Sequence, residues 1–145
     1  MAQPRQFCTF HLDRCLFGVE VHKVQEVIRD QAMTPVPLAP DVVSGLINLR
    51  GQIVTAVDLR RRLGHPPRKD DKRPMNVVLR TEDGAVSLLV DEIGDVVEVD
   101  ESGREPPPEN LRGVGRELIT GVIKMERGLL LLLDTDKALA IPTEV

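Results

Sequence analysis

The chain has 145 residues and a net charge of −4, and 41% of its residues are hydrophobic although only 2% are aromatic. Its length predicts one domain, or two small ones that share a core, and its Val, Leu and Ile content favours β-strands. The acidic charge and the absence of Trp and Tyr argue against a nucleic-acid platform, and no apolar run approaches the ~20 residues of a membrane span.

The first elements that we predict are two strands forming a hairpin. Apolar residues alternate from Phe7 to Leu12, residues 11–14 form a polar turn, and the alternation resumes from Cys15 to Val21. The N-terminal residues lack an apolar signal segment, so we expect a cytoplasmic protein. In such a protein, the two cysteines are predicted to be small buried side chains.

A metal site in this region would have to use two cysteines and two histidines. Their spacing matches no zinc pattern, and Cys8 and His11 differ in strand parity, so they point to opposite faces. We therefore expect no metal and no cofactor. The candidate ligands considered are Cys8, His11, Cys15 and His22.

A proline-rich connector over residues 34–40 leads to the most regular unit of the chain, residues 45–63. Its prolines exclude a helix or a central strand from the connector. The unit itself contains an apolar run, a turn at Arg50-Gly51-Gln52, a second apolar run and Asp58. The glycine suits a tight turn, and the position of Asp58 predicts the N-cap of a short helix.

The same order of elements recurs in residues 121–139. Gly45 precedes Asp58 by as many residues as Gly121 precedes Asp134, which is predicted to cap a second short helix. Internal similarity of this kind indicates a duplicated structural unit. The residues predicted to form the core of the repeated hairpins are Val54, Val57, Leu130 and Leu132.

A weaker similarity relates the strands that begin at Phe17 to those that begin at Val86. Two copies predict two similar β-subdomains of the size usual for small domains. The alternative is that any two hairpins followed by helices look alike. The approximate boundaries are 15–74 and 75–139 within one domain, 1–145, and the strand near 7–12 can pair with either.

The segments outside the repeated units are mostly polar. Residues 64–74 are rich in proline and charge, which predicts an exposed linker between the copies. A hairpin follows, in which residues 75–79 and 85–90 pair across the turn Glu82-Asp83-Gly84. The long polar loop over residues 101–115 contains consecutive prolines, and loops of this length are often functional.

No catalytic motif of the GxSxG, Walker A, GxGxxG or HExxH type occurs in the chain. Asp58 and Asp134 could be imagined as a catalytic pair, but helix capping accounts for each at ~1 kcal/mol. We therefore predict a module without enzymatic activity, whose function is binding. A small SH3-like or OB-like barrel that binds nucleic acid is the rival hypothesis, and the acidic charge opposes it.

Four strings of the chain together resemble the CheW family of chemotaxis coupling proteins. They are FGVEVHKVQEVIR, PLAPDVVSGLINLRGQIVTAVDLRRRLG, LLVDEIGDVVEVD and LITGVIKMERGLLLLLDTDKAL, and they span about Phe7 to Leu139. The resemblance implies a mainly β fold, in which two five-stranded SH3-like β-barrels in tandem share a hydrophobic core and carry short helices. It also implies an adaptor that couples the cytoplasmic tips of chemoreceptors to the regulatory domain of the histidine kinase CheA.

An adaptor of this family would be recruited to membrane-associated receptor arrays without inserting into the membrane. The resemblance also implies that it can assemble into rings with CheA. The alternative within the family is a coupling protein of a related, non-swimming chemosensory array, such as one that serves surface motility.

The receptor groove of the family is bordered by the segments that match KVQE and NLRG in this chain. An apolar groove there would accept one face of a helix, while the planar guanidinium of Arg50 meets carboxylate or carbonyl groups. The receptor-side candidates are Val24, Glu26, Gly45, Asn48, Arg50 and Gly51.

Structural roles are the alternative for these residues. Val24 would then belong to the core, the two glycines would meet backbone requirements, and Arg50 would pair internally with Asp58 or Glu26. We adopt the structural role for the glycines. For Arg50 we favour the interface, because a buried internal ion pair stabilises a fold only weakly.

The contact with the kinase or within a ring is less motif-like. The resemblance points to exposed strand ends and to the loop over residues 101–115. Within this loop, Leu111 and Val114 are the apolar candidates for such a contact.

Overall fold

The computed structural model describes residues 4–68, 73–109, 114–126 and 128–140. The strands are β1 (Pro4–Leu12), β2 (Cys15–Glu20), β3 (Val24–Ile28), β4 (Val43–Leu49), β5 (Gln52–Asp58), β6 (Met75–Thr81), β7 (Gly84–Val90), β8 (Glu92–Asp100), β9 (Ile119–Met125) and β10 (Gly128–Leu133). The short helical segments are η1 (Val21–Lys23), η2 (Glu101–Gly103), α1 (Leu59–Arg62), α2 (Val114–Glu117) and α3 (Thr135–Leu139).

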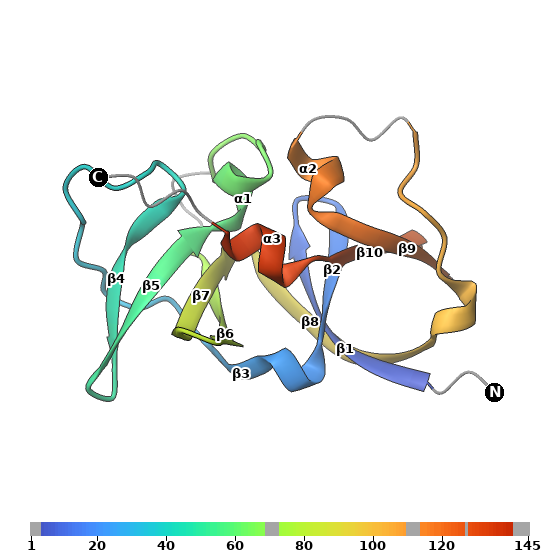
Figure 1. Cartoon of the computed structure of the whole chain (residues 1–145), viewed down its shortest axis with the longest axis horizontal. Coiled ribbons are helices and arrows are strands. Elements are labelled where there is room, and N and C mark those ends of the chain that lie inside the picture. The colour runs from blue at the N-terminus through green and yellow to red at the C-terminus, as the bar shows by residue number, and fades with distance from the viewer. Residues whose placement is uncertain (1–3, 69–72, 110–113, 127, 141–145) are drawn as a thin grey trace.

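The strands form two five-stranded sheets that lie side by side along the long axis of the molecule (Figure 1). Sheet 1 has the order β8-β1-β2-β10-β9, and sheet 2 has the order β3-β6-β7-β5-β4. Each sheet contains one parallel pair, β10 with β2 in sheet 1 and β5 with β7 in sheet 2, while its other pairs are antiparallel. The prediction of a mainly β fold with two five-stranded units and short helices is confirmed.

The composition of the sheets differs from the expected division of the chain into residues 15–74 and 75–139. The chain crosses from β2 to β3 through η1, and it crosses back from β7 to β8 at Asp91. With β1 counted in the first copy, each copy of the repeat therefore gives two strands to one sheet and three to the other. The strand near 7–12 pairs with both copies, because β1 lies between β2 and β8. Sequence similarity identifies the repeat, but hydrogen bonds between strands of the two copies determine which strands share a sheet.

The repeated units themselves have the same path. In each, an antiparallel hairpin is followed by a short helix, β4-β5-α1 in sheet 2 and β9-β10-α3 in sheet 1. The carboxylate of Asp58 accepts a hydrogen bond from the Arg60 amide at 3.0 Å, and that of Asp134 accepts one from the Lys137 amide at 3.0 Å. Both residues are N-caps, as predicted from their positions in the sequence.

In each sheet, the segment that follows one edge strand forms a backbone bridge to the opposite edge strand. Beyond β3, Thr34 exchanges two backbone hydrogen bonds of 2.8 Å with Leu46 on β4. Beyond β8, Glu105 exchanges two bonds of the same length with Val122 on β9. Both sheets are thus curled by the same kind of backbone bridge between their edges, which is a further sign of duplication.

The buried apolar residues form a cluster between the sheets and a smaller cluster within each sheet. The cluster between the sheets takes residues from both, including Phe10, Phe17 and Leu133 from sheet 1 and Val57, Leu79 and Leu88 from sheet 2. Val54, Val57, Leu130 and Leu132 are all buried, which confirms their prediction as core residues. In β10, Leu130 and Leu132 face the interior of sheet 1 while Leu133 faces the shared cluster. Both faces of β10 are thus covered from Leu130 to Leu133, which explains the consecutive leucines in this part of the strand.

Candidate partner-binding site

The turn between β4 and β5 consists of two residues, Arg50 and Gly51, because Leu49 pairs directly with Gln52. Both turn residues have positive φ, 52° for Arg50 and 89° for Gly51, as tight two-residue hairpins require. The side chain of Asn48 accepts a hydrogen bond from the Gly51 amide at 2.8 Å. Asn48 and Gly51 therefore hold the turn that presents the arginine.

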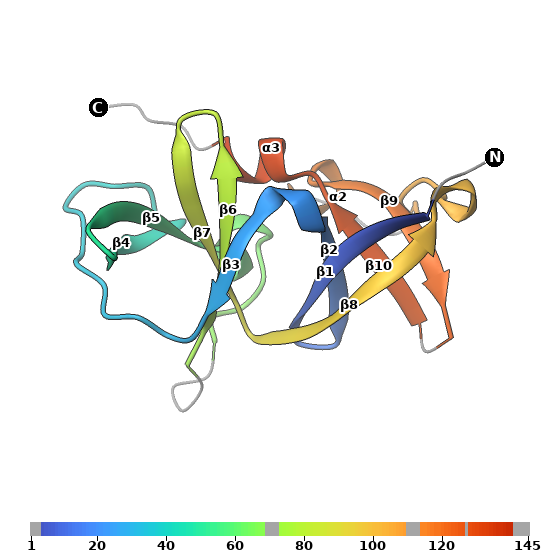
Figure 2. The ribbon, with the colours of Figure 1, turned by 90° about the horizontal axis from the view of Figure 1, so that it is seen from below.

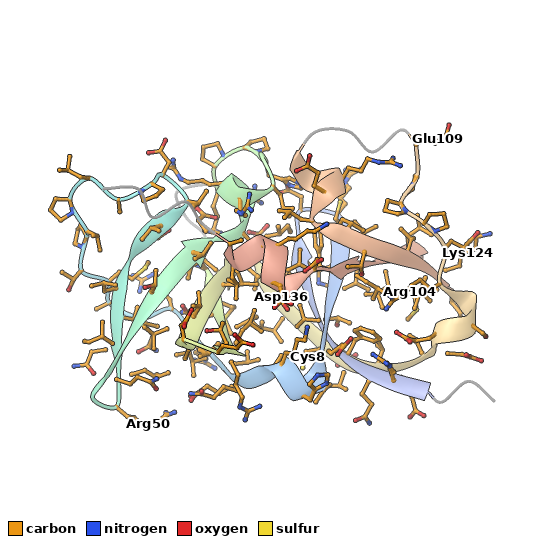
Figure 3. The ribbon with its side chains drawn as sticks, viewed as in Figure 1. Cys8, Arg50, Arg104, Glu109, Lys124 and Asp136 are labelled. Atoms are coloured by element: carbon orange, nitrogen blue, oxygen red, sulfur yellow. The ribbon has the colours of Figure 1, made fainter. Side chains whose placement is uncertain are left out.

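Arg50 forms an ion pair with Glu26 on β3, to which its guanidinium donates a hydrogen bond. Figure 3 shows Arg50 at the far tip of the β4-β5 hairpin. The arginine side chain is 68% exposed and the glutamate side chain is 21% exposed. The hydrogen bond from Arg50 lowers the pKa of Glu26, and the same bond raises the pKa of Arg50. The alternative of internal pairing is thus realised with Glu26, but on the surface rather than in the core.

Asp58, the other internal partner considered for Arg50, lies at the start of α1 and has different neighbours. Its carboxylate is 3.8 Å from the Arg61 guanidinium and 3.9 Å from that of Arg68. The exposed position of the Arg50–Glu26 pair is compatible with a partner taking the place of either member. An interface role for Arg50 therefore stays a prediction.

The two remaining candidates are tied to the fold. Val24 is half-buried and packs against the cluster between the sheets. A Cβ on Gly45 would lie 2.8 Å from the carbonyl oxygen of Thr34, so only glycine fits beside the bridge that joins the edges of sheet 2. Glu26, Asn48, Arg50 and Gly51 gather at the turn end of sheet 2, whereas Gly45 lies further along β4.

Four exposed apolar residues on the strands were not predicted from the sequence. Val27 on β3 and Val96 on β8 are 38% and 57% exposed, and these two strands are edges of different sheets. Ile53 on β5 and Leu129 on β10 are 62% and 45% exposed, and they pair with Asn48 and Lys124 in their hairpins. The signal that could have found them is the repeat, because each pair occupies matching positions in the two copies.

The candidates for a kinase or ring contact cannot be placed in this way. Leu111 lies outside the described residues. Val114 is the first residue of α2, and its side chain also lies outside the described part of the structure. Both assignments stay predictions.

Within the described residues, no group of three or more His, Cys, Asp or Glu side chains could hold a metal ion. Cys8 and Cys15 are free thiols that are half-buried, and burial raises the pKa of Cys8. None of the helices in the described ranges is long and apolar enough to cross a membrane.

Comparisons with known proteins agree with the family resemblance. A family model for the CheW-like domain matches residues 6–142. Chemotaxis protein CheW of Treponema pallidum is 31% identical over 136 residues, which cover 91% of this chain and 80% of that protein. Chemotaxis protein CheW of Bacillus subtilis is 31% identical over 123 residues, which cover 85% of this chain and 79% of that protein.

A solved structure supports the same assignment. The crystal structure of the scaffolding protein TtCheW from Thermoanaerobacter tengcongensis superposes with a TM-score of 0.81 at 28% identity, covering 90% of this chain and 89% of that one. The match extends over both sheets, so the similarity concerns the whole fold. The family predicted from the sequence is confirmed, and the chain belongs to the CheW-like domains, which are non-catalytic scaffolding and coupling modules of chemotaxis.

Proposed function

We propose that this chain is an adaptor that couples the cytoplasmic tips of chemoreceptors to the regulatory domain of a CheA-type histidine kinase. The observation that carries the proposal is the family match over residues 6–142 together with an exposed ion pair and exposed apolar strand residues. The adaptor works at receptor arrays on the cytoplasmic side of the membrane, without inserting into it.

The receptor side of the proposal uses β3 and the β4-β5 turn. Val27 offers an exposed apolar contact on β3, and Arg50 offers a planar guanidinium at the rigid turn. An amphipathic receptor helix would lay its apolar face along β3, and an acidic side chain on that helix would compete with Glu26 for Arg50. Asn48 and Gly51 support the turn, and Val24 anchors β3 to the core.

The kinase side of the proposal uses the other sheet. The bridges Thr34–Leu46 and Glu105–Val122 support an interpretation of each sheet as an SH3-like barrel, both belonging to one domain through the cluster between them. The end of such a barrel offers strand ends and exposed apolar residues such as Leu129. Leu111 and Val114 are retained as candidates for this contact or for a ring with CheA.

A binding assay with two separate fragments tests the proposal. The full chain is titrated with a receptor tip fragment and, independently, with a CheA regulatory domain. Affinities on the order of micromolar are expected for both, as is usual for small signalling interfaces. A mixture of the chain with both fragments should form a ternary complex, because the two binding surfaces are separate. Binding to neither fragment, while the chain remains folded, would reject the adaptor function.

A further inference from the structure

Within the described residues, the chain crosses between the sheets at two places that correspond in the repeat. One connection joins β2 to β3 and the other joins β7 to β8 (Figure 2). The first passes through η1, and the second passes through Asp91, the single residue between β7 and β8. Duplicated units would be expected to hold these crossings in the same way. The contacts at the two crossings are instead very different.

The crossing at Asp91 is held by buried charges. The Asp91 side chain is 9% exposed, and it accepts hydrogen bonds from Nε of Arg60 at 2.8 Å, from Nε of Arg68 at 3.0 Å and from the Asp13 amide at 2.9 Å. Its own amide donates to the carbonyl of His11 at 3.1 Å. Burial raises the pKa of Asp91, but the hydrogen bonds from Arg60, Asp13 and Arg68 outweigh burial and lower the pKa to about 2.

Arg60 is the centre of this cluster and connects it to other parts of the chain. Its side chain is 7% exposed, and its guanidinium also donates to Asp13 in the β1-β2 turn and to the carbonyl of Pro66 at 2.8 Å. Four segments therefore meet at one guanidinium: the β1-β2 turn, α1, the linker after α1 and the crossing at Asp91. Removing one member of such a buried set leaves an unpaired charge, which is strongly unfavourable.

Among the described residues, the side-chain contacts at the η1 crossing are exposed or only partly buried. Its three residues are partly or fully exposed. Arg80 donates to the carbonyls of His22 and Val24 at 3.1 and 3.2 Å, and both bonds are exposed. Lys23 donates to the hydroxyl of Thr135 at 3.3 Å. Exposed contacts of long charged side chains contribute little to stability.

We propose that the module has one fixed joint, the buried cluster around Arg60 and Asp91, and one adjustable joint, η1. The adjustable joint leads directly into β3, an edge strand that pairs only with β6 in sheet 2. Movement at η1 therefore lets the part of β3 beyond Val24 shift against sheet 1, while the cluster between the sheets and the crossing at Asp91 keep the sheets together. The link to receptor docking rests on the proposed function, because Val24 and Glu26 follow η1.

Hydrogen exchange followed by mass spectrometry on the free, full chain tests the joints without a partner. Peptides that cover Val21–Val24 should exchange at least about tenfold faster than peptides that cover Asp91–Ile93, since local opening follows the local loss of contacts. In Arg60→Met, exchange at Asp91–Ile93 should accelerate by about tenfold or more, while exchange at η1 stays as it is. Arg61→Ala is the matched control, because Arg61 lies next to Arg60 in α1 but is 52% exposed.

A second variant covers the case in which Arg60→Met does not fold. Asp13→Asn removes the negative charge of one acceptor of Arg60, on a side chain that is 51% exposed, and it should accelerate exchange at Asp91–Ile93 by a smaller factor, again without an effect at η1. Equal exchange at the two crossings of the unaltered chain would overturn the proposal. An equal acceleration of both crossings in either variant would do the same, because it would indicate global rather than local opening.

Adding a receptor tip fragment separates this inference from the proposed function. Protection at Val21–Val24 on binding, with no change at Asp91–Ile93, supports both. If the fragment does not bind and the two crossings exchange at different rates, the receptor function is rejected and the proposal about the two joints is retained. If the fragment binds and the two crossings exchange at the same rate, only the proposal about the two joints is rejected.

Discussion

The guanidinium of Arg50 in the β4-β5 turn donates to the carboxylate of Glu26 on β3, so one exposed ion pair connects the two edges of sheet 2. Each of these residues lies at an edge, where a docking helix would meet it. The pair thus links the geometry of the sheet to the proposed receptor surface, and substitutions can separate these two roles.

Arg50→Ala should weaken binding of a receptor tip fragment by about tenfold or more, the effect of losing a charge-assisted contact. Binding of the kinase regulatory domain should change less than about twofold, because that contact uses other surfaces. Titrations of the two fragments provide the measurement. Arg5→Ala is the control, because Arg5 is a half-exposed arginine of sheet 1 that also pairs with glutamates.

The charge-swapped variant Arg50→Glu with Glu26→Arg tests whether the pair itself or its orientation is needed. The swap restores an ion pair between the edges, so the urea midpoint should return toward that of the unaltered chain. Receptor binding should stay weak, because an acidic residue now stands where the guanidinium was. Full recovery of receptor binding in the swapped chain would assign to the pair a purely structural role.

Neighbouring leucines of β10 provide a matched test of the core. Leu130 is fully buried in the cluster within sheet 1, whereas Leu129 is 45% exposed. Leu130→Ala should lower the free energy of unfolding by about 2–5 kcal/mol, and Leu129→Ala should lower it by less than about 1 kcal/mol. Urea melts of the two variants give the comparison, and equal losses would contradict the alternation of faces along this strand.

Gly45 is expected to be irreplaceable for a steric reason. A Cβ at this position would lie 2.8 Å from the Thr34 carbonyl oxygen, which is bonded to the Leu46 amide. Gly45→Ala should therefore cost about 1–3 kcal/mol by forcing the bridge apart. Gly103→Ala is the control, since no described atom comes within 4 Å of a Cβ there. A melting midpoint equal to that of the control would show that the bridge yields easily.

The depressed pKa of Asp91 predicts how stability depends on pH. This pKa lies at about 2, below the ordinary value of 3.8, so folding favours the charged carboxylate. Its contribution to stability is complete above about pH 5 and is lost as the pH falls through about 2. The difference in urea midpoint between the unaltered chain and Asp91→Asn should therefore be constant from neutral pH to about pH 5 and shrink below it. Asp83→Asn, in the β6-β7 turn, is the control for removing one surface charge, and a difference that persists undiminished to pH 2 would contradict the assignment.

The exchange of strands between the copies predicts that neither half of the chain folds alone. Fragments produced by cutting between residues 70 and 71 each carry strands of both sheets, and each lacks the strands that complete them. Circular dichroism should show two unfolded fragments that form β-structure when mixed in equal amounts. A half that folds by itself would mean that the copies are independent units, as the division at residues 74 and 75 implied.

Local patterns in the sequence determined most of the secondary structure. Alternating apolar residues identified the β1-β2 and β6-β7 hairpins, a glycine identified the β4-β5 turn, and Asp58 and Asp134 identified two helix caps. Each of these features depends on residues a few positions apart, and their physical signals lie in the sequence itself. The repeat was found for the same reason, and it correctly paired the two hairpin-helix units.

The tertiary structure alone decided how these elements combine. The exchange of strands between the copies, the pairing of Arg50 with Glu26 and the buried cluster of Arg60 with Asp91 join residues that are 24 or more positions apart. No local signal distinguishes a strand that stays in its own sheet from one that crosses to the other, because both have the same alternation. The exposure of Val27 and Val96 likewise depends on which strands become edges, and that outcome is set by the packing of the whole chain.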